Sequence, residues 1–112
     1  EGQYHSDSAK EATARLLQCG VDAILCTTDM MAVAALKHVQ ENGMSVPKDI
    51  AIAGYGGTSW ADLVTPTLTT VVVDLEKEGF AAADLLLRLI DGESDIPMLD
   101  IRPVHLKVGQ SS

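Results

Sequence analysis

The feature that most constrains the fold of this chain is a regular alternation of short apolar runs with helical segments. Apolar residues recur at three- and four-residue spacing in the helical segments, whereas the intervening runs are only of strand length. The expected helices are residues 8–19, 30–42 and 74–90. The expected strands that alternate with them are residues 21–27, 50–53 and the β-branched run 69–73. Apolar strands that alternate with helices are typical of a parallel sheet covered on both faces. The sequence therefore predicts an α/β fold, a Rossmann-like parallel sheet flanked by helices.

Glycine and aspartate residues mark the expected ends of these helices. Gly20 and Gly43 follow the first and second helical segments, at positions where glycine commonly ends a helix. Asp29 precedes the second helix and Asp74 the last, and each is a suitable N-cap residue. The tail at residues 97–108 alternates in character around a proline, which predicts an edge strand or an extended arm.

The composition indicates one globular unit that does not itself bind nucleic acid. The chain has 112 residues, 46% hydrophobic and 21% charged, which suits a single core rather than a disordered segment. Asp and Glu number 16 and Lys and Arg number 8, so the net charge is −8 and a phosphate backbone would be repelled. No apolar run approaches the length of a membrane span, and we expect no membrane partner.

The two cysteines suggest a reducing compartment. Cys19 and Cys26 have neither the spacing nor the histidine neighbours of a metal site. We interpret both as buried thiols, the first near a helix end and the second within an apolar strand. The sequence thus predicts a cytoplasmic protein without a metal site.

Small and polar residues follow two of the predicted strands. Thr28 and Asp29 come after the first strand, and the glycine-rich run at residues 54–58 comes after the second. Ligands of open parallel sheets bind beyond the carboxyl ends of the strands, so these two turns are the candidate site. Three glycines within four residues match only part of the dinucleotide fingerprint, and no Walker lysine accompanies them. A polar ligand other than a nucleotide is therefore favoured.

Signatures of catalysis are missing from the sequence. We find no G-x-S-x-G elbow, no H-E-x-x-H pair and no paired-cysteine motif. His38 falls in the middle of a helix beside a lysine, His105 in the alternating tail and His5 near one end of the chain. We predict no enzyme activity, no catalytic residue and no cofactor.

Four segments in their order along the chain resemble the lactose/galactose repressor (LacI/GalR) family of bacterial transcription regulators. They are C-T-T-D-M-M-A-V-A-A-L, G-M-S-V-P-K-D-I-A-I-A-G-Y, T-P-T-L-T-T-V and the helix around G-F-A-A-A-D-L-L-L. The resemblance implies a type I periplasmic-binding-protein-like fold, in which two α/β lobes close on an effector. Residues 1–112 would then be a partial C-terminal lobe of the effector-binding domain, with the DNA-binding domain and the first lobe outside this chain.

The resemblance also implies which residues contact the effector. An aromatic residue stacks on the effector just before the first helix, and Tyr4 fits that place. Thr28 stands where the family often has an asparagine that contacts the effector. Asp29 matches the acidic residue that follows this asparagine in the family, and it serves either as a helix cap or as a ligand contact. Tyr55 either packs beside the core or stacks on a sugar ring. Gly56 replaces an aspartate that often bonds the ligand in the family, so we expect ligand recognition to differ there.

A subunit interface is implied as well. In the family it is formed partly by the helix after the polar turn and partly by the segment after the glycine turn, which reads here as one or two helical turns. The candidates for this surface are Met30, Val33, Ala34, Trp60 and Val64. For Trp60, packing beside the core or on a ligand are alternatives.

The resemblance favours one function over two others. We expect the effector-binding and dimerisation part of a sugar-responsive repressor, whose partners are a sugar or sugar phosphate, a second copy of itself and, through the missing domain alone, operator DNA. The alternative is the sugar-binding receptor of an ABC transport system with the same fold. A fragment of a nucleotide-dependent enzyme is the third class, and it predicts binding of NAD or ATP.

Overall fold

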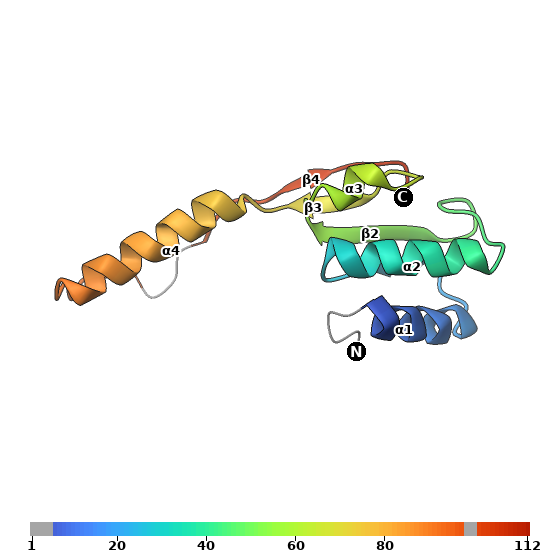
Figure 1. Ribbon diagram of the computed structural model, residues 1–112, viewed down its shortest axis with the longest axis horizontal. Helices are drawn as coiled ribbons and strands as arrows, with labels where there is room; N and C mark the ends of the chain where they lie inside the picture. The colour runs from blue at the N-terminus through green and yellow to red at the C-terminus, as the bar shows by residue number, and fades with distance from the viewer. Residues whose placement is uncertain (1–5, 98–100) are drawn as a thin grey trace. The chain divides into compact units, whose positions relative to one another are not determined.

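The computed structural model describes residues 6–97 and 101–112, and it has the alternating order of elements that the sequence predicts. In chain order these are α1 (Ser6–Gln18), β1 (Ala23–Leu25), α2 (Asp29–Glu41), β2 (Ala51–Gly56), α3 (Trp60–Leu63), β3 (Thr69–Val72), α4 (Leu75–Ile90) and β4 (His105–Lys107) (Figure 1). The predicted helix ends hold, because Gly20 and Gly43 follow α1 and α2 with positive φ angles of 69° and 75°. The α/β fold class is confirmed.

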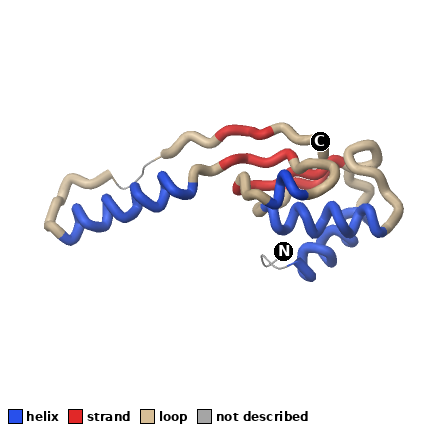
Figure 2. Tube along the Cα trace, turned by 45° about the horizontal axis from the view of Figure 1, so that its top comes forward, coloured by secondary structure: helices blue, strands red, loops and turns tan. Residues whose placement is uncertain are grey.

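The strands form one four-stranded sheet in the order β1-β2-β3-β4. Figure 2 draws these strands in red. β1, β2 and β3 are parallel, with Ile24 opposite Ile52 and Tyr55 opposite Val71. β4 is antiparallel to β3 and places Leu106 opposite Val71. The tail therefore adds the edge strand that its sequence predicts, and the sheet is mixed rather than wholly parallel.

The chain divides into two compact units. Residues 1–72 and 105–112 form the first, which contains the sheet and is called the sheet unit below. Residues 73–104 form the second, the helix unit, which contains α4. The chain thus leaves the sheet after β3 and returns to it at β4, a division that the sequence did not predict. The assignment of all 112 residues to one lobe remains a prediction.

Helices cover one face of the sheet within the sheet unit. α2 packs on β2, and α1 packs on α2. The core between α2 and the sheet includes Val39, Ile52 and Leu68, each at most 1% exposed. The opposite face carries Leu25 and Leu106, which are 75% and 62% exposed. Within the sheet unit, α2 packs on one face of the sheet and α1 packs on the outer side of α2.

The last residues of the chain are tied to the strands by hydrogen bonds. The Ser111 hydroxyl is buried, donates to the carbonyl of Ile52 at 2.6 Å and accepts from the N–H of Thr69 at 2.9 Å. The N–H of Ile52 donates to the carbonyl of Ser111 at 2.8 Å. These bonds fix the return of the chain beside β2 and β3.

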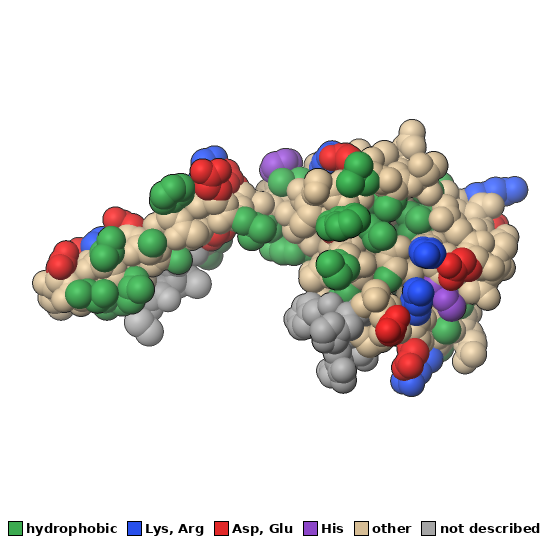
Figure 3. All heavy atoms as spheres, viewed as in Figure 1, with side chains coloured by type: hydrophobic (Ala, Val, Ile, Leu, Met, Phe, Trp, Pro, Cys, Tyr) green, Lys and Arg blue, Asp and Glu red, His purple; other side chains and the backbone are tan. Residues whose placement is uncertain are grey.

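α4 is the only α-helix of the helix unit among the described residues. As predicted, Asp74 is its N-cap, and its side chain accepts from the N–H of Lys77 at 3.1 Å. None of its 16 residues is buried, and the large apolar side chains Phe80 and Ile90 are exposed. Figure 3 shows hydrophobic side chains at the surface of this helix. In the described ranges, no helix is both long enough and apolar enough to cross a membrane.

Candidate functional site

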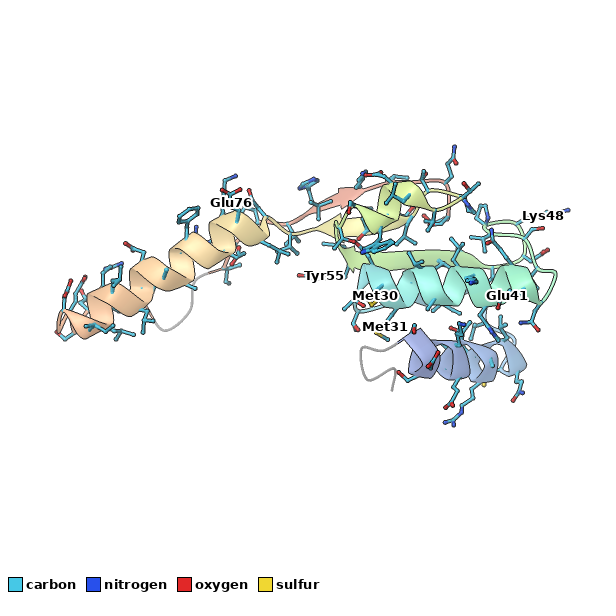
Figure 4. All side chains as sticks on the ribbon, viewed as in Figure 1. Met30, Met31, Glu41, Lys48, Tyr55 and Glu76 are labelled. Atoms are coloured by element: carbon cyan, nitrogen blue, oxygen red, sulfur yellow. The ribbon has the colours of Figure 1, made fainter. Side chains whose placement is uncertain are left out.

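The candidate site lies at the carboxyl ends of β1 and β2. These strands are parallel, so the turns that follow them meet at one edge of the sheet. The turn after β1 leads directly into α2, and the turn after β2 leads into α3. Figure 4 shows Tyr55 at the end of β2, at the same end of the sheet unit as Met30 and Met31 at the start of α2.

Thr28 is the N-cap of α2. Its backbone is extended, with φ −143° and ψ 154°, and its Oγ1 accepts from the N–H of Met31 at 3.2 Å. The prediction that Asp29 is the cap is wrong, because Asp29 is already the first residue of the helix. The accepting oxygen of Thr28 leaves its hydroxyl proton able to donate to a further partner.

Asp29 directs its carboxylate into the protein rather than along its own helix. The residue is 1% exposed. Its Oδ2 accepts from the N–H of Thr58 at 2.6 Å and from the Thr58 hydroxyl at 2.9 Å, and its Oδ1 accepts from the Thr70 hydroxyl at 2.5 Å. A negative charge at a helix start is also stabilised by the helix dipole. The carboxylate thus joins the start of α2, the turn after β2 and the strand β3.

The glycines of the turn make room for this carboxylate. A Cβ on Gly54 would lie 2.5 Å from Oδ1 of Asp29 and 2.9 Å from a methyl carbon of Leu68, which is closer than atoms can pack. Gly56 has φ +129°, a conformation that residues with a side chain rarely adopt. A Cβ there would lie 3.6 Å from Oδ2 of Asp29. A carboxylate at position 56 would therefore strain the turn and bring a second negative charge toward the first.

A pocket of about 330 Å³ opens beside the glycine turn. It is lined by Leu25, Cys26, Thr27, Tyr55 and Val71. The register places Leu25, Tyr55 and Val71 on the face of the sheet opposite α2. Tyr55 is 44% exposed, so it does not pack in the core, and its ring is a wall of the pocket. The surface that lines it is almost entirely apolar.

The cysteines differ from each other. Cys26 is buried, as predicted, and burial raises the pKa of its thiol to about 11. Cys19 is exposed at the end of α1, so the prediction of two buried thiols is wrong for this residue. Over residues 6–97 and 101–112, no three histidine, cysteine or acidic side chains are close enough together to hold a metal ion.

The structure brings together four of the five predicted ligand residues. Thr28, Asp29, Tyr55 and Gly56 lie at the ends of the two neighbouring strands. Tyr4 lies outside the described residues. The sequence did not indicate that Thr70 belongs with this group, since the β-branched run of β3 predicts only a strand and not which of its hydroxyls faces α2.

The candidate interface residues divide by exposure. Met30 and Trp60 are each 53% exposed, whereas Val33 and Val64 are half-buried. Ala34 is 6% exposed and faces the interior, so its inclusion in an outer surface is wrong. α2 and α3 pack on each other, and the exposed members can therefore belong to one surface.

A family model of the periplasmic binding protein-like domain matches residues 1–112. The chain belongs to this family. Among curated relatives, it is 37% identical to the HTH-type transcriptional regulator MalR of Clostridium butyricum over 93% of the chain and 32% of the relative. It is 34% identical to the HTH-type regulator CelR of Thermobifida fusca over 98% of the chain and 33% of the relative. The chain thus spans about a third of the length of these relatives.

Solved structures give the same result. The chain is similar to a CelR–cellobiose complex with a TM-score of 0.91 and 34% identity, over 99% of this chain and 35% of that one. It is similar to a lac repressor dimer bound to operator and an anti-inducer, with a TM-score of 0.89 and 30% identity over 100% of this chain and 40% of that one. The predicted resemblance to LacI/GalR effector domains is confirmed. These relatives are named as regulators rather than as enzymes or transport receptors, in agreement with the sequence-based choice.

Proposed function

We propose that this chain is part of the effector-binding domain of a cytoplasmic, sugar-responsive transcription repressor of the LacI/GalR type. The observation that carries the proposal is the match of nearly the whole chain to CelR with cellobiose bound, at 34% identity. A second regulator of the LacI family, 31% identical over 98% of this chain, was solved with lactose. A sugar or a sugar phosphate is accordingly the effector class that we assign.

The effector binds at the edge formed by the turns after β1 and β2. Thr28 supports this assignment because its hydroxyl can donate outward while its oxygen caps α2. Tyr55 offers a partly exposed ring beside the pocket, as sugar stacking requires. Gly56 contributes backbone alone, and Tyr4 supplies the second aromatic surface.

Two copies associate through the surface of α2 and α3 that includes Met30, Val33, Trp60 and Val64. The exposed area of Met30 and Trp60 supports this assignment, since large apolar side chains at a surface mark interaction sites. Operator DNA is bound by a domain outside this chain, because the net charge of −8 opposes contact with phosphates.

Calorimetry of the full-length protein tests the effector assignment. The panel contains cellobiose, lactose and ribose, with glucose 6-phosphate as the phosphorylated sugar. For the sugar that binds, we expect Thr28→Ala to weaken affinity about tenfold, the equivalent of about 1.4 kcal/mol for one lost hydrogen bond. Thr28→Ser is the matched control, because it keeps both the cap and the hydroxyl, and it should bind like the wild type.

Two results would contradict the proposal. Equal affinities of Thr28→Ala and the wild type would remove Thr28 from the site. Failure of every panel sugar to bind, together with binding of NAD or ATP, would favour the enzyme class instead. A helix-turn-helix at the start of the full-length protein distinguishes a regulator from a transport receptor, which begins with a signal peptide.

A further inference from the structure

We propose that Asp29 is a positioning residue, which fixes the glycine turn at the effector edge without touching the effector. The proposal rests on the function proposed above, because it assigns how one part of that site is held in shape. It replaces both sequence-based alternatives for Asp29, a helix cap and a direct ligand contact.

The first step is that the carboxylate has no surface to offer a ligand. Asp29 is 1% exposed, and both of its oxygens accept from groups of the protein. Three hydrogen bonds to one buried carboxylate are charge-assisted and therefore stronger than bonds between neutral groups. A ligand at the edge could reach these oxygens only by displacing Thr58 or Thr70.

The second step is that the turn depends on this carboxylate for its conformation. Gly56 and Gly57 carry no side chains that could pack, and glycine loses more conformational freedom on ordering than other residues. The N–H of Thr58 donates to Oδ2 of Asp29. The N–H of Gly57 lies 3.4 Å from the Thr70 hydroxyl, which itself donates to Oδ1. Asp29 thus sets the direction of two successive N–H groups, one directly and one through Thr70.

The third step concerns what the turn can offer an effector. The N–H groups of residues 57 and 58 and the Thr58 hydroxyl all point to partners inside the protein. They are not available to replace the ligand-binding carboxylate that Gly56 lacks. The turn contributes through its shape, and that shape is held by Asp29, whose helix also carries the exposed Met30 of the candidate interface.

Hydrogen exchange of the ligand-free, full-length protein tests the positioning role. For the peptide that covers residues 55–59, we expect Asp29→Ala to accelerate exchange about tenfold or more, because the Thr58 amide loses a charge-assisted bond. The exchange rate of this peptide in Asp29→Asn should lie between those of the wild type and Asp29→Ala. The one carbonyl oxygen of the asparagine can accept from either Thr58 or Thr70, but the second acceptor oxygen is lost. Asp49→Ala is the matched control: its carboxylate accepts from the N–H of Ser45 at 2.7 Å at the other end of β2.

Affinity for cellobiose, or for whichever panel sugar the wild type binds, is the second readout. We expect Asp29→Ala to weaken binding about tenfold or more, and Asp49→Ala to leave it unchanged. Val39→Ala separates positioning from general loss of stability, because Val39 is fully buried in α2 far along the helix from the turn. It should lower the unfolding midpoint without changing exchange of residues 55–59 or affinity.

The outcomes are distinguishable. Wild-type exchange of residues 55–59 in Asp29→Ala, or wild-type affinity, overturns the positioning role and leaves the proposed function standing. A wild type that binds no panel sugar overturns the proposed function, while the exchange result still decides whether Asp29 holds the turn. If Asp29→Ala does not fold, Thr58→Val and Thr70→Val replace it, since each removes one hydroxyl donor and keeps the volume of the side chain.

Discussion

α2 and α4 are both amphipathic helices with a side-chain cap, yet they differ completely in burial. α2 begins at a Thr28 cap and α4 at an Asp74 cap. Six residues of α2 are buried, namely Asp29, Ala32, Ala34, Ala35, Leu36 and Val39. α4 is longer and more apolar, but none of its residues is buried. Helix formation therefore follows from caps and periodicity in both, whereas burial depends on whether another element packs against the apolar face.

The difference extends to what stabilises each helix. α2 gains from the core that it shares with β2, where Ile52 is fully buried. α4 has local interactions, such as the pair of hydrogen bonds between Arg88 and Glu93 at 2.6 Å and 2.7 Å. Exposed ion pairs of this kind contribute little to stability. The sheet unit should therefore dominate the cooperative unfolding of this chain.

Replacement of matched isoleucines gives the largest expected contrast between the two units. Ile52 is 0% exposed in β2 and Ile90 is 71% exposed in α4. We expect Ile52→Ala to lower the free energy of unfolding by about 2–5 kcal/mol, because it removes buried carbon atoms and leaves a cavity. Ile90→Ala should change it by less than about 0.5 kcal/mol. Urea denaturation followed by circular dichroism measures both, and equal losses would mean that the apolar face of α4 is covered in solution.

Thiol reactivity gives an intermediate contrast, between a covered and an uncovered cysteine. Burial raises the pKa of Cys26 from 9.0 to about 11, whereas Cys19 is exposed. The thiolate is the reactive form, and the higher pKa lowers the thiolate fraction of Cys26 by about a hundredfold at pH 8, while burial further reduces access to the sulfur. Iodoacetamide labelling followed by peptide mass spectrometry should modify Cys19 first. Similar rates at the two positions would show that the core around Cys26 opens readily.

Acid gives the smallest expected effect, and at the start of α4 it acts through the Asp74 cap. The pKa of Asp74 is lowered from 3.8, chiefly by the side-chain hydrogen bond with Lys77 and then by the Lys77 backbone N–H. A lowered folded-state pKa means that the charged cap stabilises the helix above pH 3.8, and this contribution disappears as the pH falls through the folded-state value. The chemical shift of the Lys77 amide should follow this titration. Asp74→Asn should abolish this titration. If the Lys77 amide shift titrates equally in that variant, another group causes the change.

The sequence predicted the order of the elements well, because each depends on local signals. Apolar periodicity located α2, and glycine positions located the ends of α1 and α2. The start of α4 was correct because Asp74 is the one suitable cap before that helix. The start of α2 was wrong by one residue, since Thr28 and Asp29 are both good caps and the pattern of apolar residues does not choose between them.

The site was predicted in part. Strand order implied that the turns after β1 and β2 meet at one edge, and the resemblance to LacI/GalR proteins added residue roles. Nothing in the sequence indicated that Asp29 turns inward to Thr58 and Thr70, 29 and 41 residues further along the chain. Contacts at this separation depend on how strands are placed side by side, which local periodicity does not encode.

The sequence by itself determined the fold class, the position of the candidate site and the family, because strand–helix alternation and ordered motifs are properties of the chain. Only the tertiary structure decided that β4 runs antiparallel, that helices cover one face of the sheet unit, and that the Asp29 carboxylate serves the turn rather than the solvent. The physical reason is that hydrogen bonding and burial are settled by neighbours in space. From the sequence, the Asp29 carboxylate is interpreted as a helix cap or a ligand contact. In the fold, where β2 and β3 lie near the start of α2, it accepts hydrogen bonds that connect α2, the turn after β2 and β3.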